Sequence, residues 1–431
     1  MRRRSLIVVF TIALLSAASA TPAGATKPAK FEHPFGASAW ARIPLPFSRS
    51  SISIYSCDFT PQRKILVSGE KSDSTAFIER LSSRGRVDQS FGKRGTVSLT
   101  RRQAPDELGL LKDGSILSIS GGSTTTSPSR VYRILKSGRI DRHFSDDGVL
   151  ATPKGDRIDS WYPELKTFPK ARYFGLLYTS HMPDSNSQMR AYDFDGKRTR
   201  VFPGGSLIKF PFQVLGFKTD SAGGHLVTGS RVTSGSAKGL VLARYDERWR
   251  PIPTWGTNGI VDLGPAIGSI MRGSRPRFSQ GDAGMESAAV QQLKSGGFHL
   301  VMEFYNEHAA YAMRLSADGT LDRSWGNQGT TYLGGYLEGS DEDDDFYWAW
   351  PDSLASGRTL YWLFTRSGTT YETHSRLRVW GENGQLTGAS GREIVFHNID
   401  VQSAGFFDSD TRALICADRR GAASMSVLNI G

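Results

Sequence analysis

The chain has 431 residues, a formal net charge of +11 and two cysteines. This length is ample for a large hydrophobic core, and no stretch beyond the N-terminal segment is apolar for long enough to cross a bilayer as a helix. The basic residues are scattered and match no nucleic-acid reader motif, so we expect no nucleic-acid partner. A basic chain can instead favour anionic surfaces, or its charge can serve solubility alone.

The N-terminus is typical of a secretory signal peptide. Arg2, Arg3 and Arg4 precede an apolar run, residues 6–15, and small residues follow around Ala20 and Ala25. This order of basic, apolar and small residues marks an exported protein whose leader is removed. We therefore expect a signal peptide over 1–25, a linker over 26–34, and a mature protein that is secreted to the periplasm or outside the cell. No membrane insertion is expected after its removal.

From residue 35 onward the sequence consists of short apolar segments separated by turn residues, without useful helical periodicity. The predicted second strands of successive units are residues 64–68, 115–119, 173–178, 225–229, 298–302, 359–364 and 413–417. The predicted third strands are residues 77–81, 131–135, 189–193, 241–245, 311–315, 377–380 and 425–430. Evenly spaced short strands of this kind predict an all-β array.

A motif recurs after several of the third strands. The array of units is also incomplete at both ends of the chain. Copies of the motif, a Gly-containing turn followed by Asp, an aromatic residue and Gly, occupy residues 81–95, 135–148, 245–259 and 315–329. The last unit stops after its third strand, whereas residues 38–46 form an orphan fourth strand. The two ends add up to one unit, which predicts a single domain over 35–431: a seven-bladed β-propeller of four-stranded blades, closed by the N-terminal strand completing the last blade.

The motif resembles the delta-60 repeat of bacterial exported proteins. LSADGTLDRSWGNQG (315–329) and LSSRGRVDQSFGKRG (81–95) match that pattern almost residue for residue, whereas the third, fourth and sixth copies are degenerate. The resemblance covers the chain from about residue 35 to the C-terminus. It implies a propeller-like fold and leaves the biochemical activity open.

Repetition of the motif argues for a structural role of its residues. Its Asp is expected to accept backbone N–H groups within the turn, its aromatic ring to be buried between neighbouring blades, and its Gly to adopt a positive φ. These residues are Asp88, Asp141 and Asp322; Phe91, Phe144, Trp255 and Trp325; and Gly85, Gly138 and Gly319. A calcium loop over residues 316–322 is the competing interpretation, but a terminal bidentate Glu is missing. His225 and His299 fall within second strands and are expected to be packed.

The two cysteines, Cys57 and Cys416, lie in the first and last units. An exported protein permits a disulfide between them. Their predicted positions along the strands match poorly, however, which favours two buried thiols over a bridge.

Two long consecutive blade-to-blade loops are the candidate binding surface, because irregular loops on a rigid scaffold usually carry function. They are predicted over 264–287, which is Arg-rich, and 334–351, where an acidic run precedes aromatic residues. The second loop has three interpretations: a solvated acidic surface, a carbohydrate or peptide site with stacking tryptophans, or a calcium site. The candidate ligand-binding residues on this face are Trp161, Tyr162, His181, Arg272, Arg275, Asp343, Trp348, Trp350 and His374.

No nucleophile elbow, phosphate-binding loop or zinc-protease motif is present, so no catalytic residue is predicted. The sequence therefore predicts a monomeric binding module for a polysaccharide, a cell-envelope polymer or a protein. No cofactor is expected, apart from the calcium considered above. The alternative function is a propeller hydrolase or lyase acting on carbohydrate, with carboxylates from several blades converging near the central channel.

Overall fold

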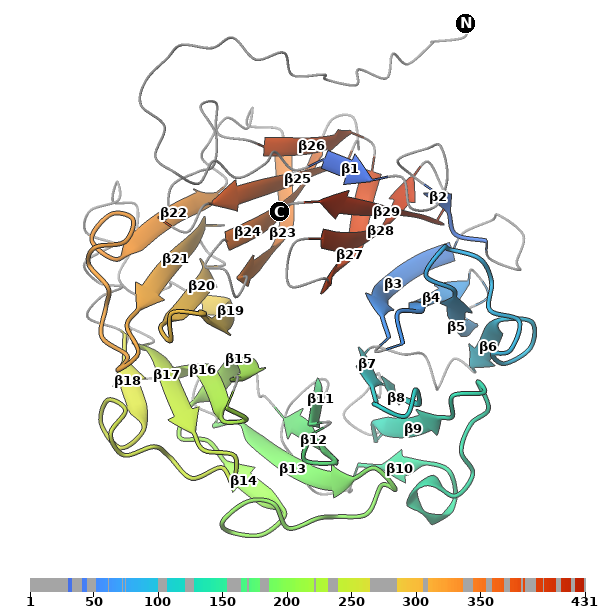
Figure 1. Cartoon of the computed structure of the whole chain (residues 1–431), viewed down its shortest axis with the longest axis horizontal. Coiled ribbons are helices and arrows are strands. Elements are labelled where there is room, and N and C mark those ends of the chain that lie inside the picture. The colour runs from blue at the N-terminus through green and yellow to red at the C-terminus, as the bar shows by residue number, and fades with distance from the viewer. Residues whose placement is uncertain are drawn as a thin grey trace, which may run out of the picture.

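The computed structural model is an all-β ring of antiparallel sheets (Figure 1). The structure describes residues 30–32, 41–44, 52–60, 62–71, 73, 75–99, 107–120, 128–152, 164–168, 170–178, 186–220, 222–231, 239–263, 285–304, 309–335, 344–353, 359–367, 373–380, 383, 393–397, 399–407, 412–419 and 423–429. Over these ranges, no helix is long and apolar enough to span a membrane.

The strands of the described ranges pair into seven sheets, numbered here in chain order. The first sheet contains β3 (Ile52–Phe59), β4 (Ile65–Lys71), β5 (Ala76–Leu81) and β6 (Thr96–Leu99). The second contains β7 (Glu107–Leu110), β8 (Ile116–Ser120), β9 (Arg130–Ile134) and β10 (Leu150–Ala151). The third contains β11 (Glu164–Phe168), β12 (Tyr173–Tyr178), β13 (Gln188–Asp193) and β14 (Leu207–Lys209).

The remaining sheets repeat this order. The fourth contains β15 (Gln213–Thr219), β16 (His225–Arg231), β17 (Gly239–Tyr245) and β18 (Ile260–Asp262). The fifth contains β19 (Met285–Gln292), β20 (Phe298–Phe304), β21 (Ala309–Leu315) and β22 (Thr330–Gly335). The sixth contains β23 (Asp344–Ser353), β24 (Thr359–Ser367), β25 (Thr373–Trp380) and β26 (Glu393–His397). The seventh is built on β27 (Ile399–Phe407), β28 (Arg412–Arg419) and β29 (Ala423–Asn429).

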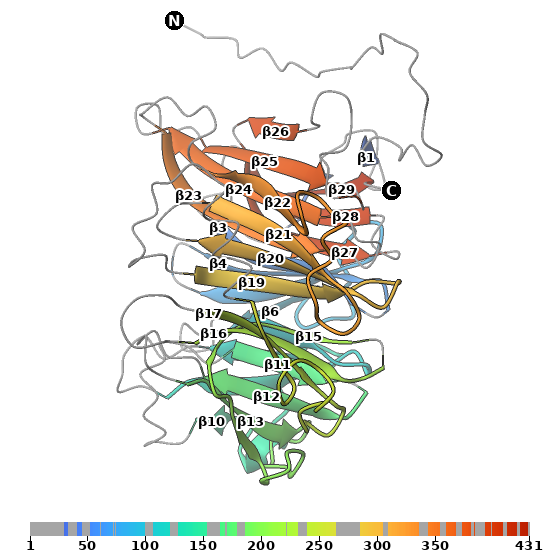
Figure 2. The same ribbon diagram turned by 90° about the vertical axis from the view of Figure 1, so that its left-hand side faces the viewer.

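The sheets stand side by side around a central axis, with first strands toward the centre and fourth strands outside (Figure 1). The second and third strands predicted from the sequence are all present, within a few residues of their expected ends. In this strand order the first-to-second and third-to-fourth turns emerge at one end of the sheets. We call that end the turn face; Figure 2 shows the ring from its edge.

The N-terminal segment pairs with the last third strand, as the incomplete ends predicted, but in two pieces. β2 (Ala41–Arg42) lies opposite Met425 and Ser424 of β29. A second short strand, β1 (Lys30–Glu32), pairs with the far end of β29. Part of the predicted 26–34 linker is therefore strand, and the folded unit begins before residue 35. The physical reason is that the exposed edge of β29 offers unpaired backbone groups along its whole length.

Cys57 of β3 and Cys416 of β28 form a disulfide, with their Cα atoms 6.1 Å apart. The interpretation that favoured two buried thiols was wrong. Val67 lies opposite Cys57 and Met425 lies opposite Cys416, so both cysteines sit in the interior of their sheets. The bridge joins the first sheet to the seventh, in a buried cluster that both sheets share.

Hydrophobic clusters fill the spaces between neighbouring sheets. The cluster between the second and third sheets, for example, contains Leu117 and Val131 from one and Phe174 and Tyr192 from the other. Similar clusters join the third sheet to the fourth and the fourth to the fifth. Because the first four sheets bury both of their faces against neighbours, their inner strands are almost continuously apolar.

Candidate functional site

The turn of the repeat motif is held by its aspartate. The Ser90 N–H donates to Asp88 Oδ1 at 3.1 Å, and the Ser324 N–H donates to Asp322 Oδ1 at the same distance. Asp141 accepts the His143 N–H at 3.0 Å in the same way. The predicted turn-stabilising role of this Asp is thus confirmed.

An arginine on the third strand completes each of these turns, which the sequence analysis missed. Arg80 Nε lies 2.8 Å from Asp88 Oδ2, and Arg314 Nε lies 3.2 Å from Asp322 Oδ2. The signal was present in the sequence, because an Arg precedes the Asp by eight residues in three copies of the motif. The side chains come together because the turn folds the chain back onto the end of the strand that precedes it.

The repeat turns also touch the next sheet. The Gly92 N–H donates to the Ser137 carbonyl at 2.7 Å, and the Ser145 N–H donates to the Asp195 carbonyl at 2.8 Å. The residue after each of these carbonyls is the motif glycine of the next sheet, with φ of 82° at Gly138. The motif aromatics are buried at these boundaries, as predicted; Phe91, for example, is fully buried.

The fourth copy of the motif departs from this pattern at Trp249, which occupies the glycine position with φ of 62°. Its indole Nε1–H donates to Tyr173 Oη of the third sheet at 2.7 Å. Its ring stacks on His225 with centroids 4.0 Å apart and meets Phe202 edge-on at 5.5 Å. This boundary is therefore built from aromatic rings, and His225 is packed as predicted.

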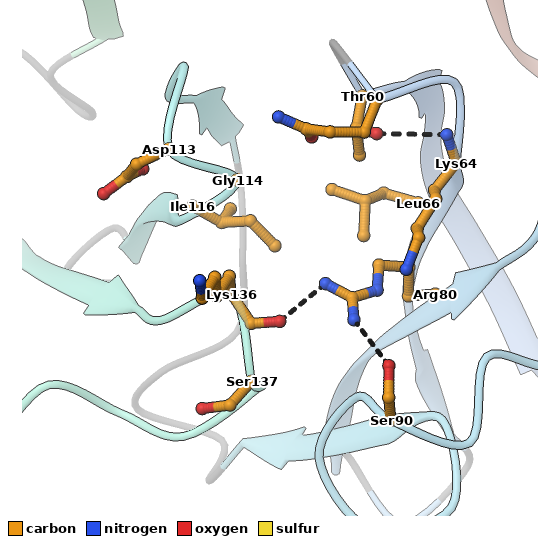
Figure 3. A pocket seen from close by; sticks show the side chains of 11 residues that line it. Thr60, Lys64, Leu66, Arg80, Ser90, Asp113, Gly114, Ile116, Lys136 and Ser137 are labelled. Carbon is orange, nitrogen blue, oxygen red and sulfur yellow. Dashed lines mark hydrogen bonds between the residues drawn. The ribbon is translucent and has the colours of Figure 1, made fainter.

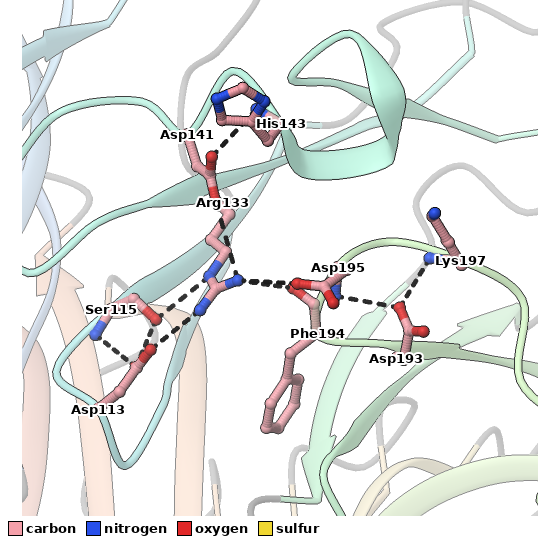
Figure 4. Close-up of polar contacts among 9 residues, drawn as sticks. All are labelled: Asp113, Ser115, Arg133, Asp141, His143, Asp193, Phe194, Asp195 and Lys197. Carbon is pink, nitrogen blue, oxygen red and sulfur yellow. Dashed lines mark hydrogen bonds and ion pairs between the residues drawn. The ribbon is translucent and has the colours of Figure 1, made fainter.

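Arg133 joins the second and third sheets through several acceptors (Figure 4). Its guanidinium lies 2.9 Å from Asp113, 3.2 Å from Asp195 and 3.8 Å from Asp141. It also donates to the Phe194 carbonyl at 3.2 Å. The planar guanidinium has five N–H donors and can therefore bond several oxygens at once. A lysine ammonium in its place could not reproduce this geometry.

A cavity of about 520 Å³ opens on the turn face between the first and second sheets (Figure 3). Its walls come from the β3–β4 turn, the strands β4 and β5 and the repeat turn on one side, and from the β7–β8 turn, β8 and the β9–β10 turn on the other. The lining residues are Thr60, Gln62, Lys64, Leu66, Arg80, Ser90, Asp113, Gly114, Ile116, Lys136 and Ser137. Hydroxyl, amide, cationic and carboxylate groups thus share the lining with Leu66 and Ile116, and more of the lining surface is apolar than polar.

An ion-paired group fixes one wall of this cavity. Lys64 Nζ and Arg80 Nε both contact Asp88 Oδ2, at 2.5 and 2.8 Å. Burial would raise the pKa of Asp88, but hydrogen bonds from Lys64 and Ser90 and the charge of Arg80 outweigh it and hold that pKa well below its usual range. Arg80 also donates to the Lys136 carbonyl at 2.7 Å across the boundary. Contacts within the first sheet and across to the second therefore hold this wall, and its Asp88 carboxylate is stabilised in the ionised form.

Two carboxylates meet one lysine on the inner strands of the second and third sheets. Lys166 Nζ lies 2.7 Å from Glu164 Oε2 and 3.9 Å from Glu107 Oε1. Glu107 Oε2 accepts the Leu165 N–H at 2.6 Å. Desolvation raises the pKa of Glu107, against the opposing charge of Lys166. This is a place where carboxylates from neighbouring sheets converge on the inner side of the ring.

Three of the nine residues predicted to bind ligand fall within the described structure, and all three belong to the sixth sheet. Trp161, Tyr162, His181, Arg272, Arg275 and Asp343 lie outside the described residues. Trp348 and Trp350 belong to β23, opposite Phe364 and Trp362 of β24. His374 belongs to β25, opposite Thr365 and His397.

The prediction of a loop over 334–351 was wrong for most of these residues. β22 extends to Gly335 and β23 begins at Asp344, so the acidic–aromatic segment is largely a first strand. The acidic run suggested a loop, but Asp344 and Asp345 pair in register with Ser367 and Arg366. Pairing with the long β24 satisfies their backbone groups, and this tertiary effect outweighs the low strand propensity of Asp.

Residues 316–322, for which a calcium loop was the alternative, form a hydrogen-bonded turn. Asp318 Oδ1 accepts the backbone N–H and the hydroxyl of Thr320, at 3.0 and 2.8 Å. Within the ranges that the structure describes, no group of three or more His, Cys, Asp or Glu residues is placed to hold a metal ion.

Comparison with known proteins gives structural likenesses only. No protein-family model matches the chain, and neither does any curated protein sequence. The β-propeller domain of the Trilobed protease from Pyrococcus furiosus is similar at 7% identity and a TM-score of 0.45, covering 88% of this chain and 93% of that one. An acylaminoacyl peptidase is similar at 10% identity and a TM-score of 0.42, covering 85% of this chain and 49% of that one. A eukaryotic initiation factor is similar at 10% identity and a TM-score of 0.36, covering 86% and 72%. Likenesses this distant say nothing of substrate or ligand.

Proposed function

We propose that the protein is an exported binding module, built as a closed seven-bladed β-propeller of delta-60 repeats. The ring of four-stranded sheets and the pairing of β1 and β2 with β29 support the closed arrangement, because each short strand covers part of an otherwise exposed edge. The signal-like residues 1–25 support export. The ligand classes considered from the sequence were polysaccharide, cell-envelope polymer and protein.

The observation that best supports this proposed function is the cavity between the first and second sheets. It is concave, opens on the turn face, and combines a mostly apolar lining surface with several polar groups from two neighbouring sheets, as ligand sites usually do. Its Asp88 is bound by Lys64 and Arg80, and its Asp113 is bound by Arg133. Carboxylates held this way can orient a ligand, but they are poor proton donors or nucleophiles.

A polysaccharide is the ligand that this lining fits best. Thr60 and Ser137 supply hydroxyls and Gln62 supplies an amide oxygen, groups that exchange hydrogen bonds with sugar hydroxyls, whereas the Ser90 hydroxyl already bonds Asp88 and Arg80. No aromatic side chain is among the lining residues, so neither a nucleic-acid base nor a sugar ring could stack there, and a glycan would be held by hydrogen bonds.

Titration calorimetry of the mature protein with neutral and acidic oligosaccharides tests this proposal. Ser137→Trp should fill the cavity and weaken binding by about tenfold or more, since it removes a contact surface worth more than about 1.4 kcal/mol. Ser83→Trp is the matched control, because Ser83 is exposed on the corresponding turn of the first sheet and does not line the cavity. Absence of binding to any oligosaccharide, or equal binding by the two variants, would overturn the proposal.

A carbohydrate hydrolase or lyase remains the second candidate, and the Glu107–Lys166–Glu164 group is the observation that favours it. Two carboxylates in one site can act as acid and as base or nucleophile, and a raised pKa suits Glu107 to proton donation. Reducing-sugar release from polysaccharides, measured for the wild type, Glu107→Gln and Glu164→Gln, decides this. Release that both variants abolish would establish the enzyme, whereas no release by the wild type would leave the binding module.

A further inference from the structure

We propose that the cavity between the first and second sheets binds a linear acidic polysaccharide, whose repeated carboxylates lie along a basic rim of five side chains. We call these residues the basic rim: Lys93, Arg94, Lys112, Lys136 and Arg139. The inference rests on the proposed binding function and specifies the charge and form of the ligand.

Two hydrogen bonds between the sheets assemble the basic rim. The Gln62 Nε2–H donates to the Lys112 carbonyl at 3.1 Å, which fixes the β7–β8 turn against the β3–β4 turn. The Gly92 N–H donates to the Ser137 carbonyl at 2.7 Å, which places Lys93 beside Lys136. A β-carbon on Gly138 would lie 2.2 Å from the Gly92 nitrogen, so the two turns are in close contact there. Arg139 is the next residue along the chain. Lys136 lines the cavity, Lys112 precedes its lining residue Asp113, and Lys93, Arg94 and Arg139 follow closely on the two residues of the Gly92–Ser137 contact beside it.

The charges of the rim are not compensated by the protein. All five side chains are exposed, and within the described residues none of them forms an ion pair. The two carboxylates nearest the cavity are already bound, Asp88 by Lys64 and Arg80, and Asp113 by Arg133. An anionic ligand would meet unpaired cations next to a wall that is fixed by its own ion pairs.

The number of these cations indicates a ligand with repeated charges. A single small anion could contact only one or two of five side chains spread around an opening of this size, whereas a chain with one carboxylate per sugar could contact several in turn. The hydroxyls of Thr60 and Ser137 suit the uncharged part of each sugar. The field of such a rim also accelerates the encounter with a polyanion, and salt screens it.

The fifth sheet provides a matched control surface on the opposite side of the ring (Figure 1). Lys294 occupies the same turn position as Lys112, and Arg323 is exposed on the fifth repeat turn. Reversal of two charges at either surface changes the net charge of the protein by the same amount. Any difference between the two double variants therefore reports position and not overall charge.

The experiment is titration calorimetry with a linear oligogalacturonate and with its fully methyl-esterified form, at low and at high NaCl. We expect the acid form to bind at least about tenfold more tightly than the ester at low salt and to lose this advantage at high salt. Lys112→Glu/Lys136→Glu should weaken binding of the acid form by about tenfold or more, whereas Lys294→Glu/Arg323→Glu should leave it within about twofold. Thermal unfolding checks that both variants are folded.

The outcomes separate this inference from the function on which it rests. Equal binding of acid and ester, with no loss in Lys112→Glu/Lys136→Glu, would overturn the acidic ligand and leave the polysaccharide-binding module in place. Binding of neither form, nor of any neutral oligosaccharide, would overturn both. Linear polyphosphate serves as the third probe: if it binds through Lys112 and Lys136 and oligogalacturonate does not, the ligand class proposed here is wrong.

Discussion

Gly138 of the second sheet lies directly against Gly92 of the first, so closely that a β-carbon on Gly138 would come within 2.2 Å of the Gly92 nitrogen. Gly138 also has a φ of 82°, a conformation that side chains disfavour. Two independent requirements therefore converge on one glycine of the repeat. The same applies at Gly319, where a β-carbon would meet Trp255 of the fourth sheet at 2.9 Å. The motif glycine is thus a boundary residue between neighbouring sheets as well as a turn residue.

Gly138→Ala should destabilise the protein by clearly more than a positive φ alone would. Gly223→Ala is the control, because Gly223 has a φ of 89° and a β-carbon there would meet nothing within 4 Å. The backbone term is about 1–2 kcal/mol at both positions. We expect Gly138→Ala to cost about 2 kcal/mol more, since the two sheets must separate locally. Denaturant unfolding of both variants measures the difference, and equal losses would contradict a contact role for Gly138.

The Cys57–Cys416 disulfide should contribute most to the boundary between the first and seventh sheets. It closes a segment of 359 residues, and bridges over long segments restrict the unfolded chain strongly. Replacing both cysteines by serine is expected to lower the free energy of unfolding by about 2–5 kcal/mol. Hydrogen exchange should then increase in β3 and β29 and remain unchanged in β12. The same midpoint for the oxidised wild type and the double variant would show that the boundary does not depend on the bridge.

Glu79 should make the protein less stable at alkaline pH. It is fully buried on β5, opposite Val67 and Thr96, and within the described residues neither carboxylate oxygen has a hydrogen-bond partner. Burial raises the pKa of Glu79 to about 8. The folded state therefore keeps a proton that the unfolded state releases above about pH 4.3, and stability that is present below that pH is lost as pH rises toward 8.

The variant Glu79→Gln removes this titration while keeping the shape of the side chain. Near pH 5 it should unfold close to the wild type, because Glu79 is then protonated in the folded protein. Near pH 9 it should be the more stable of the two by several kcal/mol, at about 1.4 kcal/mol for each unit of pKa difference. Thermal unfolding across this range tests the expectation. A constant difference at all pH values would mean that Glu79 is not protonated in the folded state.

His225 should act in the opposite direction, at acid pH. Burial lowers the pKa of His225 to about 4, against the opposing charges of Asp220 and Asp246. The unfolded state takes up a proton near pH 6.5, so stability present above that pH is lost as pH falls toward 4. Both ring nitrogens lack hydrogen-bond partners within the described residues, so His225→Phe gives up no hydrogen bond and keeps the stack on Trp249. We expect it to match the wild type at pH 7 and to exceed it at pH 5 in thermal unfolding; a parallel acid loss in both proteins would point to another group.

Much of the architecture could be predicted because the same local sequence pattern recurs in successive sheets. The very apolar second strand Tyr173–Tyr178 is buried along its whole length, and a Gly before an Asp and an aromatic residue marks the same turn in several sheets. The Arg80–Asp88 pair was also accessible from the sequence through its spacing of eight residues. By contrast, Asp344 and Asp345 were predicted as loop residues because the acidic composition around them is typical of a loop. Their pairing with β24, which makes them a strand, cannot be inferred from that local composition.

The sequence by itself determined the all-β character, the order of the strands, the turn chemistry of the repeat and the strand that pairs with the last unit. These features depend on local patterns of apolar residues, glycine and aspartate, which act over a few residues. Only the tertiary structure decided that Cys57 meets Cys416, that Trp249 fills the place of a glycine, and that the turns carrying Lys93, Lys112 and Lys136 meet beside one cavity. Each of these depends on how one sheet packs against the next, and that packing is set by the sum of many buried contacts and by no single stretch of sequence.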